Sequence, residues 1–170
     1  HDLIRIAKEA RASAIKFQMF QANKVCIPNA PKANYQVKKD NSQSQYEMLK
    51  LLELKKRELR QLSKHANDYN IDFLCTAFDI NSLDFLIDEI GIKFIKIPSG
   101  EINNFELLDH VKKKRKPIFL STGLSTQKDV DNALNFLGFR QVIKKNSRIK
   151  KKIENNISIL HCISEYPAPI

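Results

Sequence analysis

Long hydrophobic runs are absent from this sequence of 170 residues, and so is the pattern of a secretory leader. No apolar stretch approaches the roughly 20 residues that a membrane-spanning helix needs, so we expect no membrane partner. The chain does not open with the charged, apolar and small-residue segments of a signal peptide either. It begins at His1 without an initiator methionine, and we therefore expect that its natural start lies upstream.

Cysteine is scarce, occurring only at Cys26, Cys75 and Cys162. An odd number of cysteines without metal-ligand spacing argues against a disulfide framework and against a zinc site. Two of the three fall on predicted buried strands. We expect reduced thiols in the core of a cytoplasmic protein.

Acidic residues are fewer than basic ones, with 19 Asp and Glu against 29 Lys and Arg and a net charge of +10. Such a charge is compatible with nucleic-acid binding. The excess, however, lies in residues 112–116, which close a predicted helix and complement its dipole, and in residues 144–152. Neither run alternates with aromatic residues as a base-stacking surface would. We therefore expect no nucleic acid, although a non-catalytic basic nucleic-acid-binding fragment remains an alternative.

Two nucleotide-binding motifs are also missing, the Gly-x-Gly-x-x-Gly turn and the phosphate loop of nucleotide hydrolases, which disfavours a nucleotide fold. Present instead is an alternation of strand and helix patterns, which predicts an α/β fold with a parallel sheet. The expected strands are residues 14–18, 72–76, 93–97, 117–123 and 157–161. The expected helices are residues 3–10, 45–52, 55–69, 81–90, 105–113 and 126–137, with a long polar loop before residue 45.

Polar side chains lie at the carboxyl end of each expected strand. In parallel sheets and barrels these ends face the same side, so we expect one shared site. The stretch from Lys96 to Glu101 combines a cation, a hydroxyl and a carboxylate, which suit an anionic group beside a sugar hydroxyl or a proton. Lysine is seldom buried without a partner, which favours a ligand role for Lys16 and Lys96. The hydroxyls of Thr76, Ser99 and Ser121 have helix capping as an alternative role.

Five stretches, taken in order, resemble the sialic acid synthase family, which includes N-acetylneuraminate, legionaminic acid and pseudaminic acid synthases. Together they cover nearly the whole chain, so the resemblance is specific although each stretch alone is weak. They are Ile15–Gln18, Gln45–Leu49, Lys96–Glu101, Leu120–Gly123 and His161–Pro167.

The resemblance implies a metal-dependent (β/α)8 barrel enzyme. It would condense phosphoenolpyruvate with an open-chain N-acyl amino sugar, such as N-acetylmannosamine, to a nonulosonic acid and release phosphate. By this resemblance Glu101, Lys96 and Lys16 have catalytic roles. The implied phosphoenolpyruvate contacts are Lys16, Thr76, Lys96, Ser99, Ser121 and Ser164, and the implied sugar contacts are Gln18, Phe78, Glu101 and Tyr166. A related phosphoenolpyruvate-dependent 3-deoxy sugar acid synthase, which needs a cationic cluster for a sugar phosphate, is the alternative.

By the same resemblance, residues 1–170 are one partial barrel domain with strands two to six. The first, seventh and eighth strands and the C-terminal antifreeze-like domain lie outside the sequence. The divalent metal, manganese or magnesium, is expected in the full-length protein, but its ligands are not in this chain. None of the histidines, His1, His65, His110 and His161, matches a ligand position. We expect a homodimeric parent and an inactive fragment.

Three positions depart from the family pattern. Arg11 stands in a helix-to-strand turn where glycine is usual, which is expected to strain that turn. Ala77 replaces a usual proline, and Ser164 stands where some members carry asparagine. The phosphate contact expected of Ser164 is the one most affected.

Overall fold

The computed structural model describes residues 1–37, 42–139 and 156–164. They form two compact units, His1–Ile92 and Lys93–Ile170, and each is described by itself. None of the described helices has the length and apolar character required to cross a membrane.

The first unit is built on two parallel strands, β1 (Ala14–Met19) and β2 (Asp72–Ala77). Their register sets Lys16 beside Leu74 and Gln18 beside Thr76, so these four side chains share one face of the pair. The helices of this unit are α1 (Asp2–Glu9), α2 (Ala22–Val25), α3 (Asn34–Val37), α4 (Gln45–Leu52), α5 (Lys56–Asp68) and α6 (Ile80–Asp84), followed by the π-helical turn η1 (Phe85–Ile90).

The turn between α1 and β1 contains Arg11 with a φ of 58°, a left-handed conformation that glycine adopts at lower cost. This confirms the strain expected at Arg11. The helix expected at residues 81–90 is present, and Asp79 caps it, since Asp79 Oδ1 accepts a hydrogen bond from the Ser82 amide at 3.1 Å. From Phe85 onward, however, the winding is π-helical rather than α-helical, and it ends at Gly91 with a φ of 76°.

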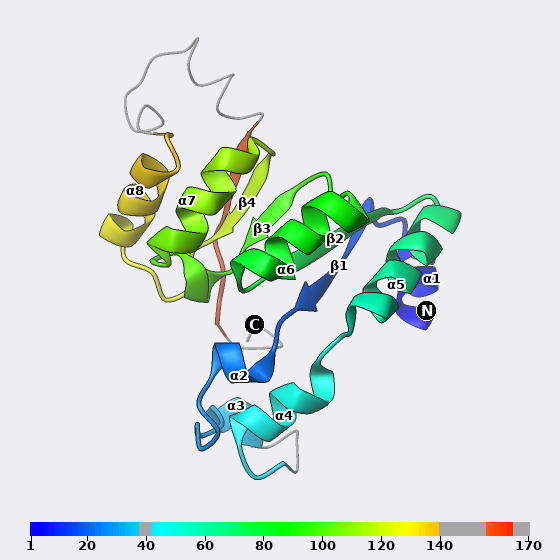
Figure 1. The fold of residues 1–170 in the computed structure, drawn as a ribbon, viewed down its shortest axis with the longest axis horizontal. Helices are drawn as coiled ribbons and strands as arrows, with labels where there is room; N and C mark the ends of the chain where they lie inside the picture. Colours follow the sequence, from blue (N-terminus) through cyan, green and yellow to red (C-terminus); the bar gives the residue numbers. More distant parts are fainter. Residues whose placement is uncertain (38–41, 140–155, 165–170) are drawn as a thin grey trace. The chain divides into compact units, whose positions relative to one another are not determined.

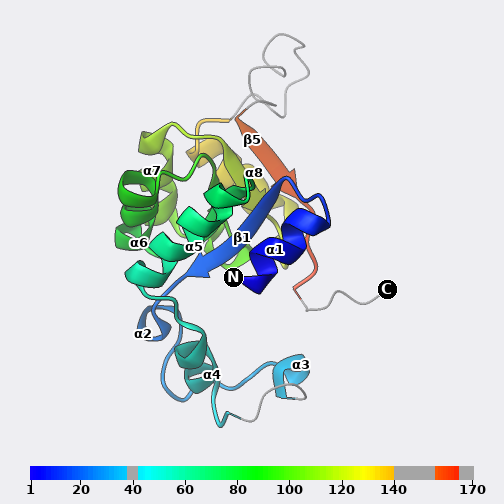
Figure 2. The ribbon, with the colours of Figure 1, turned by 90° about the vertical axis from the view of Figure 1, so that its right-hand side faces the viewer.

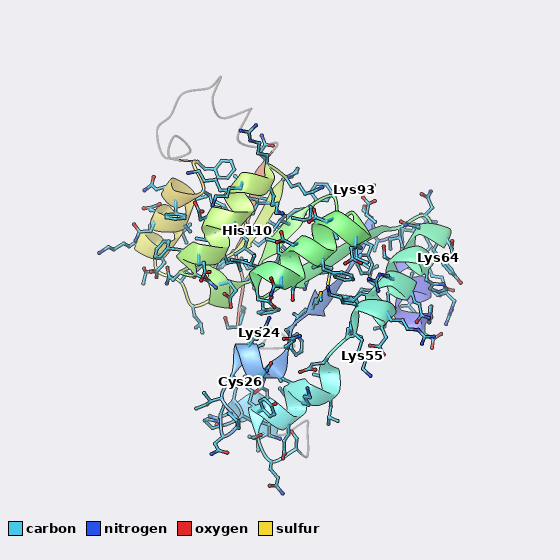
Figure 3. The ribbon with its side chains drawn as sticks, in the orientation of Figure 1. Lys24, Cys26, Lys55, Lys64, Lys93 and His110 are labelled. Atoms are coloured by element: carbon cyan, nitrogen blue, oxygen red, sulfur yellow. The ribbon has the colours of Figure 1, made fainter. Side chains whose placement is uncertain are left out.

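The segment between β1 and α5 was expected to begin as a long loop, and the short helices α2 and α3 within it were not predicted. This segment extends beyond the carboxyl end of β1, as two views at right angles show (Figures 1 and 2). The Ala22 amide donates to Glu53 Oε1 at 2.7 Å, and this bond ties the start of α2 to the end of α4. Lys24 on α2, which Figure 3 labels, also pairs with Asp79 at 3.3 Å.

The second unit contains three parallel strands, β3 (Ile95–Ile97), β4 (Ile118–Ser121) and β5 (Ile157–Leu160). Its helices are the 3-10 turn η2 (Ser99–Glu101), α7 (Phe105–Lys114) and α8 (Gln127–Phe136). The strand expected at residues 93–97 is shorter, because its pairing begins where the Ile95 amide donates to the Pro117 carbonyl at 2.9 Å.

Successive side chains along these strands point to opposite faces of the sheet. Ile97 and Leu120 are neighbours in the register and almost fully buried, as are Leu108 on α7 and Leu134 on α8. These apolar side chains form the core of the unit, and α7 lies across one face of the ladder (Figure 1). Lys96 therefore points to the opposite face, and with it the polar groups at the strand ends. Strand–helix alternation with parallel pairing confirms the predicted α/β class.

Candidate functional site

Lys96 and Ser121 form a close polar pair in the second unit. Lys96 stands beside Phe119 in the register, so Ser121, two residues further along β4, shares its face. The Lys96 ammonium nitrogen donates to Ser121 Oγ at 2.7 Å and to the Ile97 carbonyl at 3.0 Å. Since Ser121 is only 6% exposed and Lys96 is half-buried, a positive charge is held in partly dry surroundings at the strand ends.

The Ser121 hydroxyl also connects to β5. Cys162, which lies two residues beyond the end of that strand, donates from Sγ to Ser121 Oγ at 3.2 Å. One hydroxyl thus links the carboxyl ends of β3, β4 and β5. Sequence reasoning treated Cys162 only as a core thiol and missed its place here. Its position just after a strand that ends in polar residues was the available signal.

Gly123 allows two further hydroxyls to converge. Its amide donates to Ser99 Oγ at 2.9 Å. A Cβ atom at this position would lie 2.6 Å from Ser164 Oγ, closer than real Cβ atoms approach, and 3.0 Å from Ser99 Oγ, which is a tight contact. Ser99, Gly123 and Ser164 also line a cavity of about 190 Å³. Glycine at this position therefore leaves room for both serine hydroxyls beside the backbone.

Glu101 is the acidic member of the predicted set and lies at the end of η2. Its Oε2 accepts a hydrogen bond from Asn104 Nδ2 at 2.7 Å. Asn104 Oδ1 in turn accepts from the Leu107 amide at 3.1 Å and caps α7. A carboxylate does not favour an anion, so Glu101 suits a hydroxyl group or a proton rather than phosphate.

The remaining described candidates belong to the first unit. Lys16 and Gln18 are exposed, so the expectation that Lys16 is a buried strand lysine was wrong; the face of β1 that carries it is open in this unit. Thr76 is 1% exposed, and its Oγ1 has no hydrogen-bond partner among the described residues. A buried hydroxyl left unsatisfied costs about 1–3 kcal/mol, which a ligand atom at this position would offset.

Phe78 packs against Phe20, with ring centroids 5.9 Å apart and planes at 81°. This contact gives Phe78 a packing role in the first unit. Tyr166 lies outside the described residues. The structure thus brings Lys96, Ser99, Ser121 and Ser164 to one end of the second unit, and it places Lys16, Gln18 and Thr76 on one face of the first.

Burial governs the ionisation of the neighbouring thiol on β2. It raises the pKa of Cys75 to about 12, although the positive charge of Lys16 acts in the opposite direction. Cys75 is therefore a neutral core residue at ordinary pH, as the sequence predicts for a buried cysteine.

A divalent metal is implied by the family resemblance, and it would need several oxygen or nitrogen ligands close together. They contain no group of three or more His, Cys, Asp or Glu side chains placed to hold a metal ion. His65 contacts the rings of His1 and Tyr69 at 4.2 and 4.9 Å. The described part of the chain thus has no donor set that fits the metal.

The second-unit cluster combines one lysine, several hydroxyl groups and one backbone amide at the ends of three strands. Such groups donate hydrogen bonds to anionic oxygens, and phosphate and carboxylate groups are the ligands they match. The family model described as NeuB matches residues 3–170. The chain belongs to the NeuB family. Its similarity to individual members covers nearly its whole length.

Two relatives are named N,N'-diacetyllegionaminic acid synthase. The one from Campylobacter jejuni is 42% identical over 168 residues, which cover 98% of this chain and 47% of the relative. The one from Legionella pneumophila is 40% identical, again over 98% of this chain and 45% of the relative. This chain thus spans about half the length of these NeuB-family relatives.

A solved structure supports the same relationship. The N-acetylneuraminic acid synthetase of Leptospira borgpetersenii, in complex with citrate, is 27% identical with a TM-score of 0.74. The match covers 99% of this chain and 50% of that one. The α/β architecture of this NeuB-family chain is accordingly that of a partial (β/α)8 barrel, as the sequence predicted.

Proposed function

We propose that this chain is the phosphoenolpyruvate-binding part of a nonulosonic acid synthase. The observation that carries the proposal is the cluster of Lys96, Ser121, Ser99, Gly123 and Ser164 at the strand ends of the second unit. Phosphoenolpyruvate is a small anion with a phosphate and a carboxylate. A fixed ammonium group and convergent donors match such a ligand, and the family relationship supports it.

In the proposed reaction, C3 of phosphoenolpyruvate attacks the aldehyde carbon of an open-chain N-acyl amino sugar. One carbon–carbon bond forms, and the aldehyde oxygen takes up a proton. Water then adds at C2, and the tetrahedral adduct expels inorganic phosphate to leave the keto group of the product. Lys96 and the serine hydroxyls hold the anionic oxygens throughout. Glu101 accepts a hydrogen bond from a sugar hydroxyl or transfers the proton.

By the family resemblance, Lys16 and Thr76 of the first unit complete the phosphoenolpyruvate contacts, and Gln18, Phe78 and Tyr166 serve the sugar. The Thr76 hydroxyl has no hydrogen-bond partner in the described ranges, which supports a ligand contact at that residue. The similarity to two proteins named N,N'-diacetyllegionaminic acid synthase supports a diacetamido sugar as the acceptor, ahead of N-acetylmannosamine.

The test is phosphate release by the complete protein that carries this chain, supplied with phosphoenolpyruvate and one acceptor at a time. The acceptors are the diacetamido sugar that corresponds to diacetyllegionaminic acid, N-acetylmannosamine, and a phosphorylated sugar without an N-acyl group. We expect phosphate and a new nonulosonic acid, identified by mass, with the N-acyl amino sugars. Turnover with the phosphorylated sugar alone would identify a 3-deoxy sugar acid synthase instead. Phosphate release with no acceptor specificity would refute the assignment.

A further inference from the structure

We propose that Asn104 is a positioning residue that holds the Glu101 carboxylate in its working orientation. The inference rests on the proposed function, in which Glu101 serves the sugar or a proton. Its basis is the pair of hydrogen bonds that Asn104 makes with the two ends of its amide group. Asn104 Nδ2 donates to Glu101 Oε2 at 2.7 Å, and Asn104 Oδ1 accepts from the Leu107 amide at 3.1 Å.

These two bonds fix which way the amide faces. The Leu107 amide is a donor, so the atom of Asn104 that it contacts must be the carbonyl oxygen. The NH₂ group is then directed to Glu101, where it requires an acceptor. Glu101 Oε2 is thereby held as an acceptor, and the second oxygen, Oε1, is the one presented to a substrate.

The support behind Asn104 is rigid. Asn104 is the N-cap of α7, whose Leu107, Leu108 and Val111 are almost fully buried in the core of the unit. The backbone N–H of Asn104 also donates to the backbone carbonyl of Glu101 at 3.0 Å, so the backbone between the two residues is closed into a turn. The carboxylate is thus fixed to a packed helix rather than to a free loop, as a reacting group requires.

The adjacent asparagine supplies a matched control. Asn103 is exposed, and its Nδ2 contacts Asp129 Oδ1 at 3.4 Å instead of Glu101. The same substitution at positions 103 and 104 therefore separates the Glu101 contact from a general effect of changing this segment.

The first variant is Asn104→Ser in the complete protein. Serine caps a helix about as well as asparagine but is too short to reach Glu101, so α7 should remain folded. Misplacing a reacting group by about 1 Å costs up to ~100-fold, and we expect kcat to fall ten- to a hundredfold. The KM for phosphoenolpyruvate should change less than about twofold, since the hydrogen bonds of Asn104 go to Glu101 and Leu107 and not to the second-unit cluster of Lys96 and the serines. Asn103→Ser changes a side chain that lines the cavity beside Ser99 but does not contact Glu101, and it should lower kcat less than Asn104→Ser does.

A double-mutant cycle distinguishes positioning from capping. If Asn104 acts through Glu101, then Asn104→Ser should have little further effect on kcat in a Glu101→Gln background. Additive losses in the double variant, or a normal kcat in Asn104→Ser, would overturn the inference. Normal turnover in Glu101→Gln alone would instead remove the proposed role of Glu101.

Asn104→Asp keeps the test decisive if the serine variant unfolds. Aspartate caps helices as well as asparagine, but it replaces the donor to Glu101 by a second carboxylate. We expect a thermal unfolding midpoint close to that of the natural protein together with a kcat at least as low as that of Asn104→Ser. A stable Asn104→Asp protein with normal kcat would contradict the positioning role.

Discussion

The Lys96 ammonium nitrogen lies 2.7 Å from the Ser121 hydroxyl oxygen, at the carboxyl ends of two neighbouring parallel strands. Lysine carries a long and flexible side chain, and the bonds to Ser121 and to the Ile97 carbonyl restrict it before any ligand arrives. A preorganised cation loses less conformational entropy on binding an anion than a free one does. The pair thus prepares one edge of the second unit for an anionic substrate.

Replacement of Lys96 by alanine should weaken phosphoenolpyruvate binding about ten- to a hundredfold, since a charge-assisted hydrogen bond contributes ~1.5–3 kcal/mol. Amino sugar binding should change far less. Calorimetric titration of each substrate separately into the complete protein measures both effects. Lys112→Ala removes the same charge from the exposed last turn of α7 and serves as control. An unchanged phosphoenolpyruvate affinity in Lys96→Ala would remove Lys96 from the site.

The second-unit cluster of Lys96 and the serines was predicted in part from the sequence. Lys96, Ser99 and Ser121 were predicted to lie together because each stands at or just after the carboxyl end of a strand pattern, and parallel strands end on the same side. The contacts that arrange them were not predictable. The backbone of Gly123 lies close to two serine hydroxyls, and Cys162 donates a hydrogen bond to the hydroxyl of Ser121. Such contacts depend on distances of a few tenths of an ångström, which residue patterns do not encode.

Replacement of Gly123 by alanine should weaken phosphoenolpyruvate binding with little loss of stability. The added methyl group would lie 2.6 Å from Ser164 Oγ and 3.0 Å from Ser99 Oγ, so both hydroxyls must move. We expect about a tenfold loss of affinity, which corresponds to ~1.4 kcal/mol, in the same titration. Gly100→Ala is the matched control, because a Cβ atom there meets nothing within 4 Å. Equal effects of the two substitutions would show that crowding at Gly123 is irrelevant to binding.

Replacement of Glu101 by glutamine should preserve phosphoenolpyruvate affinity and abolish most of the turnover. The amide keeps the size of the side chain but loses its charge and its capacity to take a proton, a contribution of about 10²–10⁴ in rate. Titration of phosphoenolpyruvate and measurement of phosphate release on the same preparation give the two values. If turnover in the variant stays near normal, Glu101 has only the structural role of anchoring the turn before α7.

The local structure was predicted with uneven success for physical reasons. The boundaries of α4 and α5 follow from apolar spacing, and they agree with the prediction within one residue. The short α2 and α3 were missed because one-turn helices have no periodicity, and α2 depends on a tertiary bond from Ala22 to Glu53. The π-helical turn at Phe85 has no counterpart in the residue pattern. The basic run at residues 144–152 lies outside the described residues.

Cys75 should make stability depend on pH in the alkaline range. Its ordinary pKa is 9.0, and burial raises the pKa in the folded chain to about 12. The neutral thiol therefore contributes its full stabilisation below about pH 9, and the contribution is lost as the pH rises toward 12. The difference in unfolding free energy between the natural protein and Cys75→Ala should thus shrink between about pH 8 and about pH 10.5. Denaturant titrations at both values measure it, and a constant difference would contradict the raised pKa.

The chain of residues 1–170 should have little or no synthase activity on its own. A closed barrel leaves no strand edge, whereas in the part of the chain that the structure describes β1 pairs only with β2, and β5 only with β4. Ile159 on β5 is 44% exposed, and no described helix follows that strand to cover it. Open edges with apolar side chains favour association over a stable site.

The activity test uses the purified 170-residue chain beside the complete protein, each with phosphoenolpyruvate, N-acetylmannosamine and manganese. We expect phosphate release from the complete protein alone. The 170-residue chain retains the Lys96 and Ser121 pair, but no cluster in its described residues fits a metal. A turnover of about 1 per second or more by the short chain would show that the further strands of the barrel are dispensable. The short chain could bind phosphoenolpyruvate weakly without turning it over. If Lys96→Ala abolishes that binding, the result would agree with a second-unit cluster that forms without the rest of the protein.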